Sequence, residues 1–165
     1  MDLLLIETYN GGDLRLKGND LEVLPGWGNM PYLAMFGGNV EASTKVRQPQ
    51  EQVFDWWGND LLMSQDTSVQ FNSYTEKALK DTPLTSAGRV KIQQAVEKDL
   101  VFMKEFAIIN VIVSIVDVNK VRIQINVKQP SDTASQYKAV IFIWDGTLQS
   151  LDGDFSIFDF NNDFF

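Results

Sequence analysis

Cysteine and histidine are both absent from the 165-residue sequence. Without cysteine no disulfide can form, so the hydrophobic core alone must hold the fold together. The same absences exclude a Ser-His-Asp triad, a Cys-His nucleophile pair and the zinc sites that need histidine or cysteine ligands. A pair of carboxylates is one catalytic arrangement that this composition still permits.

Basic residues are few. The chain has 14 lysines and arginines against 22 aspartates and glutamates, which gives a formal net charge of −8. This excess of negative charge argues against nucleic-acid binding, because neutralisation of phosphates supplies most of that affinity. It also disfavours adhesion to an anionic membrane. We therefore expect partners other than nucleic acid or membrane.

Long apolar runs are missing as well. No run reaches the roughly 18 residues that suggest a transmembrane helix. The start of the chain carries the acidic Asp2 where a signal peptide needs basic residues, and the apolar run that follows is short. We expect a protein that is made in the cytoplasm.

The sequence does contain enough apolar residues for one domain. They make up 44% of the chain, and a chain of about 150 residues can bury roughly 68–70% of the surface that it exposes when unfolded. No repeat or low-complexity linker interrupts residues 1–145. We predict a single domain over 1–145, followed by a C-terminal arm over 146–165.

Short strands and helices are predicted for the N-terminal part. The segment Leu3–Tyr9 predicts a strand that ends at the turn-forming residues Asn10-Gly11-Gly12. Residues 17–20 predict the turn of a small hairpin. Asn29 is placed to cap a short helix that has Pro31 in its first turn and ends at Gly37-Gly38. A second helix is expected over about residues 70–80.

The clearest helix is predicted over residues 86–106. Its apolar residues recur at steps of three and four and so form one stripe, which can cover a sheet. The stripe consists of Ile92, Val96, Leu100 and Met103. Charged residues occupy the opposite, solvent-facing side: Arg89, Lys91, Glu97, Lys98 and Lys104.

Three strands are predicted after this helix. Residues 109–116 are apolar on both faces, as in a strand that is covered on both sides. Residues 121–128 alternate between apolar and polar like a half-buried strand, and an edge there is a candidate for strand addition by another chain. A third strand is expected over Tyr137–Trp144. The predicted fold is α+β: short N-terminal strands and helices, then a long amphipathic helix packed on a three-stranded antiparallel meander.

The C-terminal arm is acidic and rich in phenylalanine. From Asp145 to the end the chain has five aspartates and no lysine or arginine. So short an acidic segment cannot form its own core, yet exposed phenylalanines lower solubility unless something covers them. Two alternatives stay open: the arm folds back or is disordered, or it docks on a partner.

The least ordinary string in the chain is Phe54-Asp55-Trp56-Trp57-Gly58-Asn59-Asp60. Neighbouring residues on a strand face opposite sides, so one tryptophan can enter a core while the other stays outside. Tryptophan is also enriched at interface hot spots. Core or loop anchoring, a protein interface and a ligand site all remain open for this pair.

The templates for catalysis and metal binding fit poorly. Gly26-Trp27-Gly28 lacks the third glycine of a dinucleotide-binding fingerprint. Asp152, Asp154 and Asp163 occupy three positions of a calcium loop, but Ile157 stands where the loop needs glycine. Asp55 and Asp60 flank the tryptophans as a possible carboxylate pair, but an acidic chain yields such pairs by chance. We predict no enzyme, no metal and no cofactor.

The order of these features resembles a known family. Gly11-Gly12-Asp13-Leu14 lies near the start, a short helix and a loop follow, and Asp55-Trp56-Trp57-Gly58-Asn59 is similar to a Trp-Trp-Gly-Asp signature. Together with the amphipathic helix and the strands after it, residues 10–145 resemble the baseplate wedge or sheath-initiator proteins of contractile phage tails. The resemblance is to the Mu-like branch, which is related to the T-even wedge protein long labelled an acidic lysozyme.

The resemblance implies a structural protein of a bacteriophage virion or of a phage-derived contractile injection device. Members of the family sit in six copies around the tail tube, join wedge proteins to the first sheath ring and initiate sheath assembly. Sheath arms there add strands to a neighbour's sheet. The expected partners are therefore other baseplate wedge proteins, the sheath subunit and the tail tube, with assembly from the host cytoplasm into the viral tail.

We predict that a loop and the arm contact these partners. The loop residues are Phe54, Asp55, Trp56, Trp57, Gly58 and Asn59, and the arm residues are Phe155, Phe158, Phe160, Phe164 and Phe165. Two other functions stay open. One is a soluble adaptor or regulatory binding domain, and the other is a peptidoglycan-cleaving hydrolase that would use Asp55 and Asp60.

Overall fold

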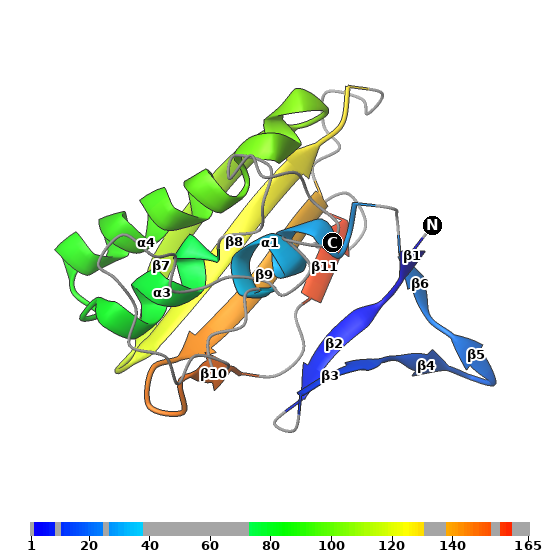
Figure 1. The fold of residues 1–165 in the computed structure, drawn as a ribbon, viewed down its shortest axis with the longest axis horizontal. Coiled ribbons are helices and arrows are strands. Elements are labelled where there is room, and N and C mark those ends of the chain that lie inside the picture. The colour runs from blue at the N-terminus through cyan, green and yellow to red at the C-terminus, as the bar shows by residue number, and fades with distance from the viewer. Residues whose placement is uncertain are drawn as a thin grey trace, which may run out of the picture.

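The main body of the molecule is an antiparallel sheet of five strands with helices packed on one face (Figure 1). This arrangement confirms the predicted α+β class. The computed structural model describes residues 2–8, 11–24, 27–37, 73–130, 138–152 and 156–159.

Three consecutive strands form the body of the sheet: β7 (Ile108–Asp117), β8 (Lys120–Lys128) and β9 (Lys138–Asp145). Strand β8 is central, because it pairs with β7 on one side and with β9 on the other. The candidate edge on residues 121–128 is therefore wrong. The edge on this side of the sheet belongs to β7.

Two further strands pair with the other side of β9: β10 (Ser150–Leu151) and β11 (Ser156–Asp159). The sheet thus has five strands where the sequence predicted three. Both added strands come from the segment predicted as an arm. A two-residue strand is too short for an alternation of apolar and polar residues to be visible in the sequence, which explains why β10 was missed.

The helices are α1 (Met30–Phe36), α3 (Tyr74–Asp81) and α4 (Ser86–Asp99). The predicted helix over 86–106 ends at Asp99, and a 3-10 helix, η1 (Val101–Glu105), continues it. Residues three apart lie on the same side of a 3-10 helix, so Leu100 and Met103 stay on the buried side. Both are fully buried.

The start of α4 depends on a close approach between two segments. The hydroxyl of Thr85 accepts a hydrogen bond from the Gly88 N–H (3.1 Å) and caps the helix. A Cβ atom at Gly88 would clash with the main-chain oxygen of Pro83. Only glycine fits this position without a shift of the backbone.

One hydrophobic core joins the helices to the sheet. The predicted stripe of α4 is buried, and Ile92 and Val96 are both 0% exposed. On β8 every second residue points into this core, as the alternation over 121–128 predicted. The residues on that face of β8 are Val121, Ile123, Ile125 and Val127.

The N-terminal part forms three small two-stranded antiparallel units. They pair β1 (Asp2–Leu3) with β6 (Val23–Leu24), β2 (Leu5–Thr8) with β3 (Gly11–Leu14), and β4 (Leu16–Lys17) with β5 (Asp20–Leu21). Gly11 and Gly12, which were predicted as turn residues, begin strand β3 instead.

Asn29 precedes α1, as predicted, but its side chain makes no cap hydrogen bond to that helix. Its amide group donates to the main-chain oxygen of Leu3 (2.5 Å) and accepts from the Leu5 N–H (3.2 Å). The side chain therefore fixes the first strands against α1, a long-range role that the local sequence does not reveal.

Candidate partner-binding edge

The two edges of the main sheet differ. Strands β10 and β11 line the outer side of β9, whereas no described strand pairs with the outer side of β7. An edge strand presents unpaired main-chain N–H and C=O groups to any extended segment that comes alongside. The outer side of β7 is therefore the candidate site.

The orientation of the β7 main chain follows from a hydrogen bond on the far side of the sheet. The main-chain carbonyl of Ile143 on β9 accepts from the Asp152 N–H (2.7 Å), so the main-chain N–H and C=O groups of Ile143 point away from β8. The residue opposite Ile143 is Arg122 on β8, which in turn lies opposite Ser114 on β7. Arg122 therefore forms no main-chain hydrogen bond with Ile143, and its main-chain groups face β7 instead. Arg122 and Ser114 are thus a hydrogen-bonded pair, whose main-chain N–H and C=O groups bond to each other.

It follows that the neighbouring residue, Val113, turns its main-chain groups outward. An independent contact agrees with this: the guanidinium of Arg89 on α4 donates to the Val113 carbonyl (3.3 Å). By the same alternation the main-chain groups of Ile109 and Val111 also point outward. Arg89 thus occupies one outward carbonyl, and no described residue pairs with the groups of Ile109 and Val111.

The sequence of β7 gives this edge little protection. Natural edge strands are commonly protected by charged residues, proline or a bulge. From Ile108 to Val116 the strand has no charged residue and no proline. The register shifts between Ile115 and Asp117, so the bulge protects only the C-terminal end of the strand.

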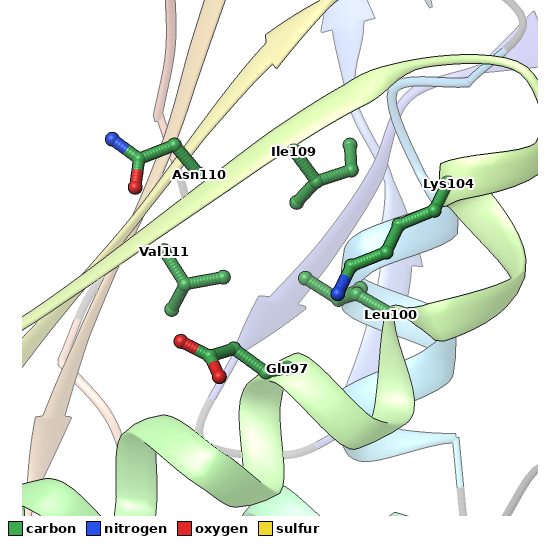
Figure 2. Close-up of a pocket in the computed structure, with 6 residues that line it drawn as sticks. All are labelled: Glu97, Leu100, Lys104, Ile109, Asn110 and Val111. Carbon is green, nitrogen blue, oxygen red and sulfur yellow. The ribbon is translucent and has the colours of Figure 1, made fainter.

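A groove runs beside the first half of the edge. It has a volume of about 220 Å³ and lies between β7 and the end of α4 with η1. Figure 2 shows the carboxylate of Glu97 beside Val111, and the side chain of Lys104 reaching in from η1 on the side of Ile109. The six lining residues are Glu97, Leu100, Lys104, Ile109, Asn110 and Val111.

The face of the sheet opposite the helices is open in the described part of the chain. Ile108 is 60% exposed, Ile112 is 45% exposed and Val116 is 51% exposed. The prediction that residues 109–116 are covered on both sides is therefore wrong for the described residues. The reason is that α1, α3 and α4 all pack on the same face of the sheet (Figure 1).

One half-buried acid, Asp99, lies away from this edge, where α4 ends beside α3. The carboxylate of Asp99 accepts from the Tyr74 N–H (3.0 Å) and from the N–H and hydroxyl of Thr75 (2.7 Å each). Burial raises the pKa of Asp99 to about 6, although these hydrogen bonds and the charge of Lys98 oppose the rise. Its acceptor oxygens are engaged by α3, which indicates a structural role for this carboxyl group.

Charged side chains fasten β10 to the sheet. The ammonium of Lys120 lies 2.5 Å from the Asp152 carboxylate and 3.5 Å from that of Asp145. Asp145 also accepts from the N–H groups of Thr147 and Leu148, and these bonds hold the pKa of its carboxyl below the usual range. The hydrogen bond to Asp152 raises the pKa of Lys120.

The residues predicted to bind partners lie almost entirely outside the described part of the chain. This holds for the loop residues Phe54, Asp55, Trp56, Trp57, Gly58 and Asn59, and for the arm residues Phe155, Phe160, Phe164 and Phe165. The main chain of Phe158 belongs to β11 and pairs with Ala139 on β9. At this point the arm folds back on the chain's own sheet.

Sequence reasoning did not find Arg89, Glu97 and Lys104 as site residues. They were placed on the solvent-facing side of the helix, and their charges gave no further signal. Their position beside an open edge depends on the order of the strands in the sheet, which spacing alone does not reveal.

Within the described ranges, no cluster of three or more histidine, cysteine, aspartate or glutamate side chains could hold a metal ion. None of the described helices is long and apolar enough to cross a membrane. The chain matches no protein-family model, no curated protein and no solved structure.

Proposed function

We propose that the protein is a non-catalytic structural subunit that binds a neighbouring protein by strand addition at the outer edge of β7. In this proposal it is a baseplate wedge component of a contractile tail, which joins wedge proteins to the first sheath ring and initiates sheath assembly. The open β7 edge is the observation that supports strand addition. The resemblance to the wedge family is the basis for proposing that the particle is a contractile tail.

The physical argument concerns what an added strand would gain. Ile109 and Val111 offer outward main-chain groups to an extended segment, and such hydrogen bonds give affinity with little demand on sequence. The exposed side chain of Ile112 would add apolar contact on the open face. A subunit with these properties fits a role in assembly, because many copies must be joined reliably by short segments.

In the same proposal, α4 with η1 and strands β7 to β9 are the counterpart of the family's helix and three-stranded meander. Strands β10 and β11 would then be additions of this chain. The loop residues 54–59 would contact a second wedge protein, and residues 160–165 would contact a neighbouring subunit. Six copies per particle are expected from the resemblance.

The first test removes one outward donor from β7. Proline has no N–H and is tolerated on an edge strand where that N–H faces solvent. We expect Val111→Pro to keep the fold and to abolish incorporation into tail or baseplate particles, measured by pull-down from the native source and negative-stain electron microscopy. Circular dichroism would check the fold.

Val111→Ala is the matched control. It keeps the main-chain N–H but removes core volume, since Val111 is 6% exposed, at a cost of about 1–3 kcal/mol. Incorporation of Val111→Ala but not of Val111→Pro would support strand addition. Equal incorporation of both variants would contradict it.

The same pull-down separates the two other functions. A stable complex with one soluble protein and no particle would favour an adaptor. Clearing of cell-wall suspensions that is lost in Asp55→Asn or Asp60→Asn would favour a hydrolase.

A further inference from the structure

We propose that the groove beside β7 selects its partner by charge order: it binds an antiparallel segment of another protein in which a basic residue precedes an acidic residue by two positions. The inference rests on the proposed function, because it takes the outer side of β7 as the site of strand addition. It adds the chemistry of the segment that the site accepts.

The charges that face the groove come from α4 and η1. Arg89, Gln93 and Glu97 are four residues apart and therefore form one row along α4. The Gln93 amide donates to the Glu97 carboxylate (3.0 Å) and holds it in this row. Lys104 follows on η1, so the edge carries a negative charge beside Val111 and a positive charge beside Ile109 (Figure 2). In the described part of the chain neither Glu97 nor Lys104 forms an ion pair.

An added strand would meet these charges with every second side chain. Residues two apart on a strand point to the same face, and the face toward the helices is the one that meets Glu97 and Lys104. A basic side chain opposite Val111 would pair with Glu97, and an acidic side chain opposite Ile109 would pair with Lys104. The side chain between them would lie opposite Asn110 on the open face, with the exposed Ile108 and Ile112 as diagonal neighbours, so an apolar residue fits there.

Direction decides the order of the two charges. An antiparallel segment reaches the position opposite Val111 first and the position opposite Ile109 two residues later, so it carries the basic residue first. The antiparallel direction is the one in which β10 and β11 pair with the other edge, and it is the slightly more stable one per residue. Arg89 sets the limit of the site, because it occupies the carbonyl of Val113.

A second copy of the chain fits this groove less well. Strand β7 has no charged residue from Ile108 to Val116, so its own strand would bring no charge to Glu97 or Lys104. The occupant that complements both groups is a segment of a different protein.

The test uses two peptides of identical composition as probes. One is acetyl-Ser-Val-Thr-Val-Lys-Val-Asp-Val-Ser-amide, and in the other the lysine and the aspartate are exchanged. For the measurement, both carry the same fluorescent label in place of the N-terminal acetyl group, and binding to the full chain is measured by fluorescence anisotropy at low salt. We expect the Lys-first peptide to bind about tenfold more tightly, since two exposed pairs become attractive in one order and repulsive in the other.

The double variant Glu97→Lys, Lys104→Glu should reverse this preference. The reversal is its own control for folding, because a misfolded chain would bind neither peptide or both equally. Amide hydrogen exchange should show that the Lys-first peptide protects Ile109 and Val111. Equal binding of the two peptides to the unmodified chain, or protection elsewhere, would overturn the inference.

Two further results would also overturn it. Slow exchange of Ile109 and Val111 without peptide would mean that the chain covers its own edge. A concentration-dependent dimer in sedimentation that Val111→Pro disrupts would mean that a second copy is the occupant. If the peptides bind without preference while Val111→Pro still blocks particle incorporation, the charge rule fails and the proposed function stands. If the preference is found but the chain enters no particle, the charge rule stands and the proposed function fails.

Discussion

At the scale of single residues, Asp99 links the end of α4 to the start of α3, and its contribution to the free energy of unfolding depends on pH. Its ordinary pKa of 3.8 applies to the unfolded chain, and burial raises the folded value to about 6. The folded chain therefore binds this proton more tightly than the unfolded chain does. The stability that follows is fully present below pH 3.8 and is lost as pH rises through about 6.

Asp99→Asn tests this linkage, because asparagine does not ionise. Between about pH 4 and pH 7 we expect the free energy of unfolding of the unmodified chain to fall relative to the variant by roughly 2–3 kcal/mol. Urea unfolding over a series of pH values measures the difference. Thr75→Ala removes a hydroxyl that favours the charged form and should move the fall to higher pH. A difference that stays constant with pH would contradict the argument.

At the scale of elements, the first strands of the C-terminal segment belong to the fold. Leu151 on β10 is 7% exposed and joins the core, Asp152 binds Lys120, and β11 pairs with β9 over Ser156–Asp159. The phenylalanine content of this segment suggested a contact with a partner, but part of it completes the chain's own sheet. Its removal should therefore affect stability.

We predict that two truncations behave differently. A chain that ends at residue 159 keeps β10 and β11 and should retain a cooperative thermal transition at nearly the same midpoint. A chain that ends at residue 149 should lose several degrees, because Leu151 alone contributes about 2 kcal/mol or more. Thermal unfolding followed by circular dichroism compares the two, with Leu151→Ala in the full chain as the control. Identical midpoints for both truncations would show that the two strands contribute nothing.

The sequence was most informative where one periodic pattern covered several turns of a helix or most of a long strand. The stripe from Ile92 to Met103 and the alternation over 121–128 predicted buried faces that the structure contains. Shorter features could not be predicted, because a two-residue strand such as β10 has no periodic pattern. The exposure of Ile112 could not be predicted either, since an apolar residue has the same sequence signal whether its face is covered or open. The Trp56-Trp57 predictions lie outside the described residues and stay predictions.

At the scale of the whole molecule, a net charge of −8 coexists with an apolar, uncharged edge strand. Net charge keeps chains apart, whereas an open apolar edge brings them together by unwanted pairing. The two effects can be separated, because a single lysine on β7 protects the edge while it lowers the magnitude of the net charge from 8 to 7.

We therefore predict that Ile112→Lys reduces self-association of the isolated chain at high concentration, measured by sedimentation velocity. Ile112 is 45% exposed on the open face, so the fold should tolerate a lysine whose ammonium reaches water. Val118→Lys is the matched control, because Val118 is 84% exposed in the turn after β7 and the charge change is the same. If net charge governed association, both variants would associate slightly more than the unmodified chain. A decrease for Ile112→Lys alone assigns the association to the β7 edge, and the same variant should then compete poorly for incorporation into particles.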